Sequence, residues 1–234
     1  MANYTNLKGA NASFSDMMKR FGIVTVMNAD IYNSSDIFTE EDKVYSVEEI
    51  KTAITSAKDK KLCTLDTLKV ANLSVEGPSK TVTGGQYSNP LIKFGKSARL
   101  EMQDALGNAE AIEALCGGIV EYTKGTDGKD PIAALHYGED FTGPKTIIGK
   151  SFFINQKTGA QVPVTIIFYQ FLPDSLFNLS QDAEGDATVF DMNGDLLITV
   201  VKIPGAKGTE GTEGTTVDHG VFYSILPEMT ASAD

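Results

Sequence analysis

The strongest constraint on the fold is the alternation of side-chain polarity along residues 91–103. One set of alternate positions is mainly apolar: Ile92, Phe94, Ala98, Leu100 and Met102, joined by Lys96. The other set is polar: Lys93, Ser97, Arg99, Glu101 and Gln103. A repeat of two residues is typical of a β-strand that buries one face and exposes the other to water. The segment therefore predicts one long strand at the surface of a sheet.

Further strands are expected from runs that are rich in β-branched and aromatic residues, whereas helical periodicity is scarce. The alternation in the candidate strand 68–75 slips between Val70 and Leu73, as it does at a β-bulge. Residues 162–172 are apolar on both faces, which is typical of a central strand. The other candidate runs are residues 23–32, 119–123, 146–155, 187–192, 195–201 and 221–225.

A polar segment and a helix are expected between two of these strands. Residues 33–45 are polar and acidic, which predicts a solvated loop. In residues 46–59, apolar side chains recur at helical spacing. Ser46 followed by Glu49 forms a capping box, in which each side chain accepts a hydrogen bond from a free amide at the start of the helix.

A second short helix is expected over residues 109–116. Asn108 is a favourable N-cap, and Gly117 can end the helix because glycine accepts a positive φ. Near the end of the chain, residues 205–216 include two Gly-Thr-Glu triplets and predict a flexible loop.

The dipeptide Asn193-Gly194 has two interpretations. Its turn propensity predicts a hairpin between two strands. Alternatively, the surrounding sheet overrides that propensity and one strand continues through both residues.

Charge and composition exclude several classes of function. The formal net charge is −11, and Arg20 and Arg99 are the two arginines. Sequence-specific binding of duplex DNA and docking on anionic lipid both need a basic surface, so neither is expected. The first residues lack the apolar region of a secretory signal, and no apolar run is long enough to span a membrane. We expect a protein without a membrane anchor that is made inside the cell.

Candidate catalytic and metal-binding residues are few, so we expect no enzyme and no cofactor. The two histidines, His136 and His219, and the distant Cys63 and Cys116 do not form a zinc-site pattern. Common nucleophile, zinc and phosphate-loop motifs are missing from the sequence. The acidic group at 182–186 lacks the spacing of a calcium loop.

Residues 80–118 carry a more specific pattern. A loop that contains lysine, threonine and glycine leads to the long amphipathic strand, then to Gln103-Asp104-Ala105-Leu106, and then to a short capped helix that ends in Gly-Gly. In residues 162–201, a buried strand exits through Phe171-Leu172-Pro173 and is followed by an acidic turn and another strand. These two segments together cover about half of the chain. The order of their elements resembles that of the major tail tube proteins of tailed bacteriophages.

The resemblance implies a single domain over residues 1–234, with a mainly β, sandwich-like or barrel-like fold and one or two short helices. Such subunits close into hexameric rings, which form a barrel around a lumen and stack into a tube that DNA crosses during ejection without sequence-specific binding. The implied partners are further copies of the chain, a tape measure protein, a baseplate or hub, and a sheath in contractile tails. The implied location is the virion tail, assembled in the cytoplasm of the host bacterium.

Two expectations concern particular segments of such a subunit. The polar positions Lys93, Ser97, Arg99, Glu101 and Gln103 would face the lumen, with Lys93 and Arg99 neutralised by carboxylates such as Glu101; alternatively, this face meets water on the outside. The helical and loop excursion at 33–62 would pack against an adjacent subunit or ring instead of completing the core of its own subunit.

Two other interpretations remain open. A tube subunit of a type VI or extracellular contractile injection system would share the fold and differ in cargo. A carbohydrate-binding β-sandwich would use exposed aromatic side chains to stack on sugars, but the chain contains no Trp.

Overall fold

The structure is a computed structural model. It describes residues 28–40, 42–66, 68–77, 79–81, 91–93, 95–104, 109–124, 131–138, 141–154, 161–179, 190–204 and 216–228. Of the loop expected at 205–216, residues 205–215 lie outside the described residues, as do the acidic group at 182–186 and the N-cap Asn108. Thr216 is the first residue of β14.

The described residues are mainly β, with short helices, as the sequence predicts. The first part of the chain contains β1 (Asn28–Asn33), α2 (Ser34–Ile37), β2 (Tyr45–Ser46), α3 (Val47–Ser56), the 3-10 helix η1 (Lys58–Lys60), β3 (Cys63–Leu65), β4 (Leu68–Glu76), β5 (Ser79–Thr81), β6 (Leu91–Lys93) and β7 (Ser97–Asp104). The second part contains α4 (Ala109–Cys116), β8 (Gly118–Tyr122), β9 (Ile132–Tyr137), β10 (Lys145–Ile154), β11 (Gln161–Leu179), β12 (Phe190–Leu196), β13 (Thr199–Pro204), β14 (Thr216–Val221) and β15 (Tyr223–Pro227).

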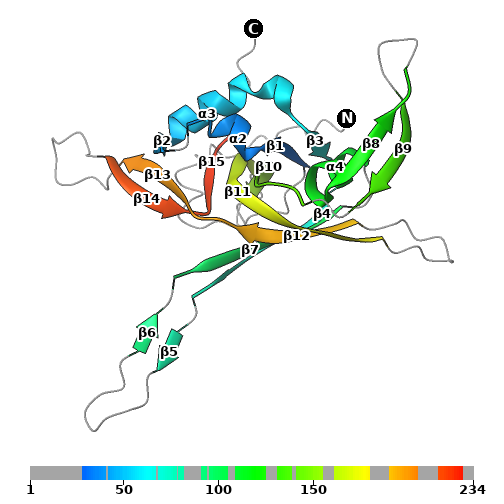
Figure 1. Ribbon diagram of the computed structural model, residues 1–234. Helices are drawn as coiled ribbons and strands as arrows, with labels where there is room; N and C mark the ends of the chain where they lie inside the picture. The colour runs from blue at the N-terminus through cyan, green and yellow to red at the C-terminus, as the bar shows by residue number, and fades with distance from the viewer. Residues whose placement is uncertain are drawn as a thin grey trace.

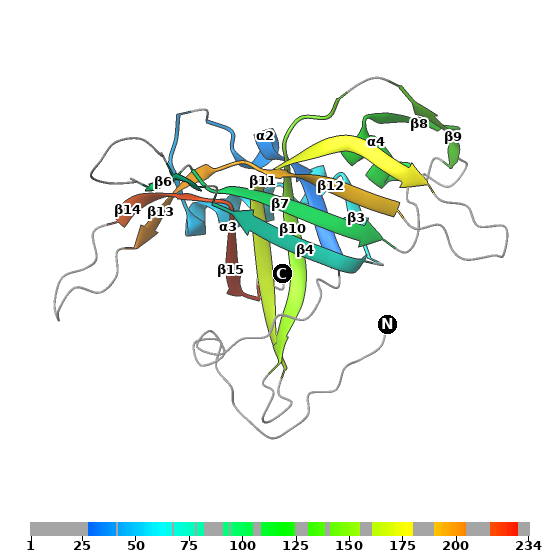
Figure 2. The ribbon, with the colours of Figure 1, turned by 90° about the horizontal axis from the view of Figure 1, so that it is seen from below.

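The long strand β11 connects two layers of one main sheet, whose order is β3–β1–β10–β11–β12–β7–β4. The first part of β11 lies between β10 and β15, and its last part pairs with β12. Figures 1 and 2 show that β12, β7 and β4 run across the direction of β10 and β11, as in a sandwich. The sheets of the described residues form no closed barrel within one chain.

Three smaller sheets extend from this body. The first has the order β14–β13–β2, in which β13 and β2 are parallel. The other two are the antiparallel pairs β5–β6 and β8–β9. In Figure 1 the pair β5–β6 continues outward from β4 and β7, while β8–β9 and β13–β14 lie at opposite ends of the molecule.

Two large apolar clusters hold the layers together. The first joins β7 and β12 to α4 and to strands β1 and β3, through residues that include Ile31, Leu100, Leu115 and Met192. The second lies where α2 and α3 cover β10 and β11, through residues that include Ile37, Ile50, Ile148 and Tyr169. Burial of these side chains is the main stabilising contribution to the fold.

The expectation that the excursion at 33–62 does not complete the core of its own subunit is wrong. Ile37 and Ile50 are completely buried against β10 and β11 of the same chain, so this segment completes the subunit's own core. Part of the expected loop is the helix α2, which has a buried side. The acidic character of residues 40–42 concealed the apolar residues on either side, which pack inward because they cover a sheet face.

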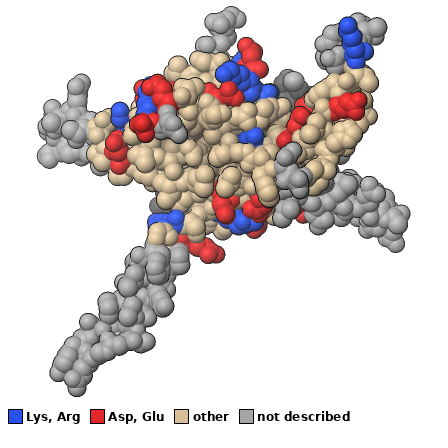
Figure 3. Space-filling model, viewed as in Figure 1, with Lys and Arg blue, Asp and Glu red and all other residues tan. Residues whose placement is uncertain are grey.

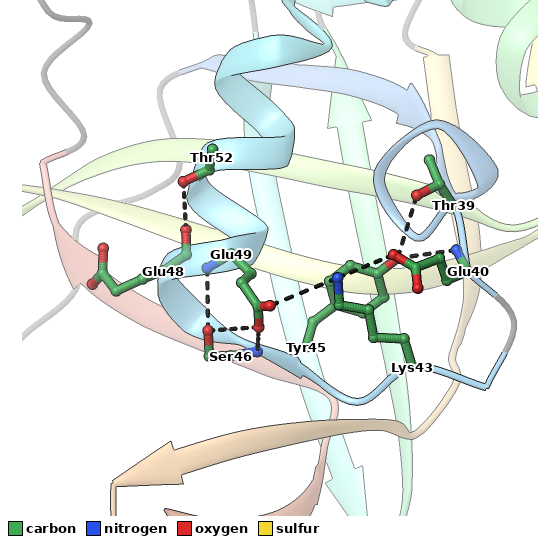
Figure 4. A network of polar contacts seen from close by, with 8 residues as sticks. All are labelled: Thr39, Glu40, Lys43, Tyr45, Ser46, Glu48, Glu49 and Thr52. Atoms are coloured by element: carbon green, nitrogen blue, oxygen red, sulfur yellow. Dashed lines mark hydrogen bonds and ion pairs between the residues drawn. The ribbon is translucent and has the colours of Figure 1, made fainter.

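The predicted start of α3 is confirmed. The Ser46 hydroxyl accepts a hydrogen bond from the Glu49 amide at 3.3 Å, and the Glu49 carboxylate accepts one from the Ser46 amide at 2.8 Å. Figure 4 shows Lys43 between Glu49, at 3.7 Å, and Glu40, at 3.1 Å. Its ammonium group also lies 4.9 Å from the centre of the Tyr45 ring. These contacts fasten the loop to the beginning of the helix.

The second predicted helix is also confirmed, because α4 spans the expected residues and buries Ile112, Leu115 and Cys116. Gly117 follows it with a φ of 79°, a conformation that glycine adopts without strain.

Asn193-Gly194 is not a turn, because β12 runs through both residues. Asn193 pairs with Glu101, and Gly194 pairs with Leu100 on one side and Pro173 on the other. Sheet pairing on both edges therefore overrides the turn propensity of the dipeptide.

Two expected strand boundaries are wrong. The strand predicted over 91–103 is interrupted, because Gly95 and Lys96 belong to no strand and separate β6 from β7. The strand predicted to exit at Pro173 instead continues to Leu179, with a register shift between Pro173 and Phe177 that accommodates the proline. A register shift in β4 lies between Leu68 and Val70, slightly before the predicted bulge.

Candidate functional site

The candidate site is one face of the layer formed by β4, β7, β12 and the last part of β11. Along β7, Ala98, Leu100 and Met102 are buried in the core. The residues between them point away from it, so the predicted division into a buried face and a wet face is confirmed for β7. Figure 2 views the layer from the side on which β4, β7 and β12 lie nearest to the viewer.

Strand register extends this polar face across the layer. Glu101 lies between Asn72 of β4 and Asn193 of β12, and Arg99 lies between Ser74 and Asp195. We define the polar face by its described side chains: Asn72, Ser74, Glu76, Ser97, Arg99, Glu101, Gln103, Leu172, Asp174, Asp191, Asn193 and Asp195.

Arg99 is held by two aspartates. One guanidinium nitrogen donates a hydrogen bond to Asp174 of β11, and the other donates to Asp195 of β12 at 3.2 Å. The hydrogen bond to Asp174, together with its charge, raises the pKa of Arg99 above its ordinary value. The guanidinium group thus joins β7 to its neighbour β12 and, beyond it, to β11, and its charge is balanced within the sheet.

The expectation that carboxylates on other strands neutralise Arg99 is confirmed, but these carboxylates are Asp174 and Asp195, because Glu101 shares the strand of Arg99. Gln103 donates a hydrogen bond to Asp191 at 2.9 Å. Glu101 lies opposite two asparagines, Asn72 and Asn193.

Lys93 does not share a strand with the other four predicted residues. It belongs to β6, where it pairs with Ser79 of β5. The structure thus brings together Ser97, Arg99, Glu101 and Gln103 and leaves Lys93 in a separate pair of strands.

The described side chains of the polar face are predominantly acidic. Against Arg99 stand five carboxylates: Glu76, Glu101, Asp174, Asp191 and Asp195. Figure 3 shows acidic and basic side chains next to each other along the lower side of the molecule, where this layer lies. A polyanion such as nucleic acid would meet net repulsion at this face.

Sequence reasoning missed the aspartates of this face. Asp191 and Asp195 alternate with buried residues of β12, a repeat of two that the turn propensity of Asn193-Gly194 concealed. Asp174 follows Pro173, where proline is normally a sign that a central strand has ended.

The candidate catalytic residues do not form a site. His136 lies on the exposed β9 strand, 3.3 Å from the Glu121 carboxylate. Cys63 and Cys116 are free and buried, and burial raises the pKa of each thiol to about 12. Within the described part of the chain, no three His, Cys, Asp or Glu side chains are placed to hold a metal ion. Among these residues, too, no helix has the length and apolar character needed to cross a membrane.

No protein-family model matches the sequence, and no curated protein matches it.

Proposed function

We propose that this chain is a structural subunit of a bacteriophage tail tube. In this proposal six copies close into a ring, rings stack into a tube, and DNA crosses the lumen during ejection. The protein resides in the virion tail, is assembled in the host cytoplasm, and works without catalysis, metal or cofactor. The order of segments in residues 80–118 and 162–201 supports the proposal through its resemblance to tail tube proteins.

The observation that carries the proposal is the polar face. One side of this layer is packed into the core, whereas the other presents five carboxylates and an arginine whose charge is balanced by Asp174 and Asp195. A channel wall for DNA needs this character, because each free cation would bind a phosphate and slow its passage. Six copies with a net charge of −11 give a ring of about −66, which disfavours adhesion of DNA.

Unpaired sheet edges supply a means of assembly. β3 and β4 are the end strands of the main sheet, and among the described strands each pairs on one edge only. An unpaired edge offers main-chain donors and acceptors to another chain, and ring closure removes such edges. The tape measure protein, a baseplate or hub, and a sheath are further partners in this proposal.

Electron microscopy of the purified protein at high concentration tests the proposal. We expect six-fold rings or tubes with a central channel. Uniform monomers at every concentration, with and without other tail components as nuclei, would contradict it. Monomers that bind glycans would favour the carbohydrate-binding interpretation instead.

A further inference from the structure

Among the described strands, β8 and β9 form a small sheet of their own. The two strands are antiparallel: Gly118 pairs with Tyr137 at one end, and Tyr122 pairs with Ile132 at the other. In Figure 1 the pair extends outward beside α4. At its base, a Cβ atom at Gly118 would lie 3.2 Å from the Ile112 side chain of that helix, so the strand and the helix approach each other closely. Two strands alone bury too little surface to be stable in water, so this sheet depends on α4 or on an additional strand.

The outer edge of β9 lacks the usual protection against pairing. Among the described strands, β9 pairs with β8 alone. Its six residues, Ile132–Tyr137, contain no Lys, Arg, Asp, Glu or Pro, which are the residues that normally keep an edge from joining another chain. Ile132 is 46% exposed, so the edge also carries uncovered apolar surface.

A second strand of the same kind lies at the other end of the molecule. β14 also has six residues, Thr216–Val221, and within the described part of the chain it pairs with β13 alone. Asp218 is its one ionised side chain, and Val217 is 44% exposed. Figures 1 and 2 both place β14 and β9 at opposite ends, so the two edges of one chain do not meet.

We propose that β9 of one copy pairs edge to edge with β14 of the next copy. The contact joins the β8–β9 sheet to the β14–β13–β2 sheet, giving one continuous sheet of five strands across two subunits. Main-chain hydrogen bonds along six residues supply the affinity, and the alternate side chains, including Ile132 and Val217, supply the specificity. The two strands have equal length, which lets both edges be covered completely.

This contact is heterologous, because each copy offers one edge of each kind. Copies therefore follow one another head to tail with a constant rotation, and the polar face of every copy takes the same orientation within the assembly. The inference rests on the proposed tube assembly and specifies one of its contacts.

The test uses three double variants of the full chain. The first variant carries Ile132→Lys and His136→Lys, which block the β9 edge. The second carries Val217→Lys and His219→Lys, which block the β14 edge. Thr52→Lys with Thr55→Lys is the matched control, since it adds two lysines to the exposed surface of α3. Thermal melting verifies that each variant folds. If the first pair disturbs the hairpin, the exposed His136→Lys change alone replaces it.

Sedimentation and mass photometry give the readout. We expect the association constant between copies to be at least tenfold lower for each edge variant than for the wild type. The control should assemble like the wild type. An equal mixture of the two edge variants should form a species of twice the mass found in either alone, because one intact edge of each kind remains.

Three results would overturn the inference. Edge variants that assemble like the wild type, a mixture with no larger species, or a β14 variant that is unaffected while the β9 variant fails would each exclude this pairing. In all three cases the wild type still assembles, so the proposed function stands. A wild type that stays monomeric contradicts the proposed function itself and removes the inference with it.

Discussion

Gly194 occupies a point in β12 where the main chain of β11 comes too close for a side chain. A Cβ atom there would lie 2.3 Å from the Leu172 carbonyl oxygen and 2.6 Å from the Phe171 ring. The carbonyl group belongs to a paired strand and the Phe171 ring is completely buried, so neither can move aside. The glycine is therefore required by packing, although the sequence favours a turn at this position.

We expect Gly194→Ala to lower the free energy of unfolding by about 1–3 kcal/mol, the usual cost of overpacking a close contact. Urea unfolding at constant pH measures the change. Gly143→Ala is the matched control, because a Cβ atom at Gly143 meets nothing within 4 Å. Equal stability of the two variants would contradict the close approach of β11 and β12.

The buried cysteines give a second prediction at the scale of the residue. Burial raises the pKa of Cys63 and Cys116 to about 12, so both thiols remain protonated at pH 8. We expect neither to react with a thiol reagent in the native protein, and both to react after unfolding. Because unfolded thiols release their protons near pH 8.5, stability falls as the pH rises from about 9 toward 12. The Cys63→Ala, Cys116→Ala double variant should lose this part of the pH dependence, and rapid native labelling would show that the thiols are accessible.

Glu101 tests the repulsive character of the polar face. Glu101→Lys places an unpaired cation opposite two asparagines, so a passing phosphate would bind there. We expect assembly to be unchanged and DNA release to slow at low salt, with recovery at high salt. The measurement is the rate of DNA release from particles that carry the variant. The control is Glu48→Lys on α3, which changes the net charge by the same amount. Release at the wild-type rate at both salt concentrations would remove this face from the channel.

At the scale of the element, α3 is part of the core that it covers. Ile50 is completely buried among residues of β10, β11 and β13. We expect Ile50→Ala to cost about 2–5 kcal/mol of unfolding free energy, and the exposed Thr52→Ala change to stay within about 0.5 kcal/mol. Chemical denaturation of both variants measures this difference. A loss below about 1 kcal/mol for Ile50→Ala would mean that α3 packs loosely and is free to serve a contact between subunits.

Elements whose signals are local could be predicted from the sequence. The capping box of Ser46 and Glu49 marks the start of α3, and the alternation in residues 97–103 identifies both faces of β7. The continuation of β11 past Pro173 and of β12 through Asn193-Gly194 could not be predicted, because pairing with distant strands decides it. The partners of Arg99 escaped prediction for the same reason: Asp174 and Asp195 are 75 and 96 positions away in the sequence.

For the whole molecule, the arrangement of surfaces connects the fold to the proposed assembly. The polar face lies on one side, α3 lies on the opposite side, and the edges of β9 and β14 lie at the two ends (Figures 1 and 2). Head-to-tail contacts through the ends keep every polar face on the same side. If the polar faces line the inside of the ring, the acidic surface encloses the channel and α3 faces outward.

The most direct test of this account is the labelling of single introduced cysteines with a large polyethylene-glycol maleimide. Glu101→Cys reports on the polar face and Thr52→Cys on the exposed side of α3, while the native cysteines are buried. In dissociated protein both variants should react. In the assembled protein, the account predicts that the Thr52→Cys variant still reacts and that the Glu101→Cys variant is protected. Equal reaction of the Glu101→Cys variant in both states would contradict the claim that the polar face lines an enclosed channel.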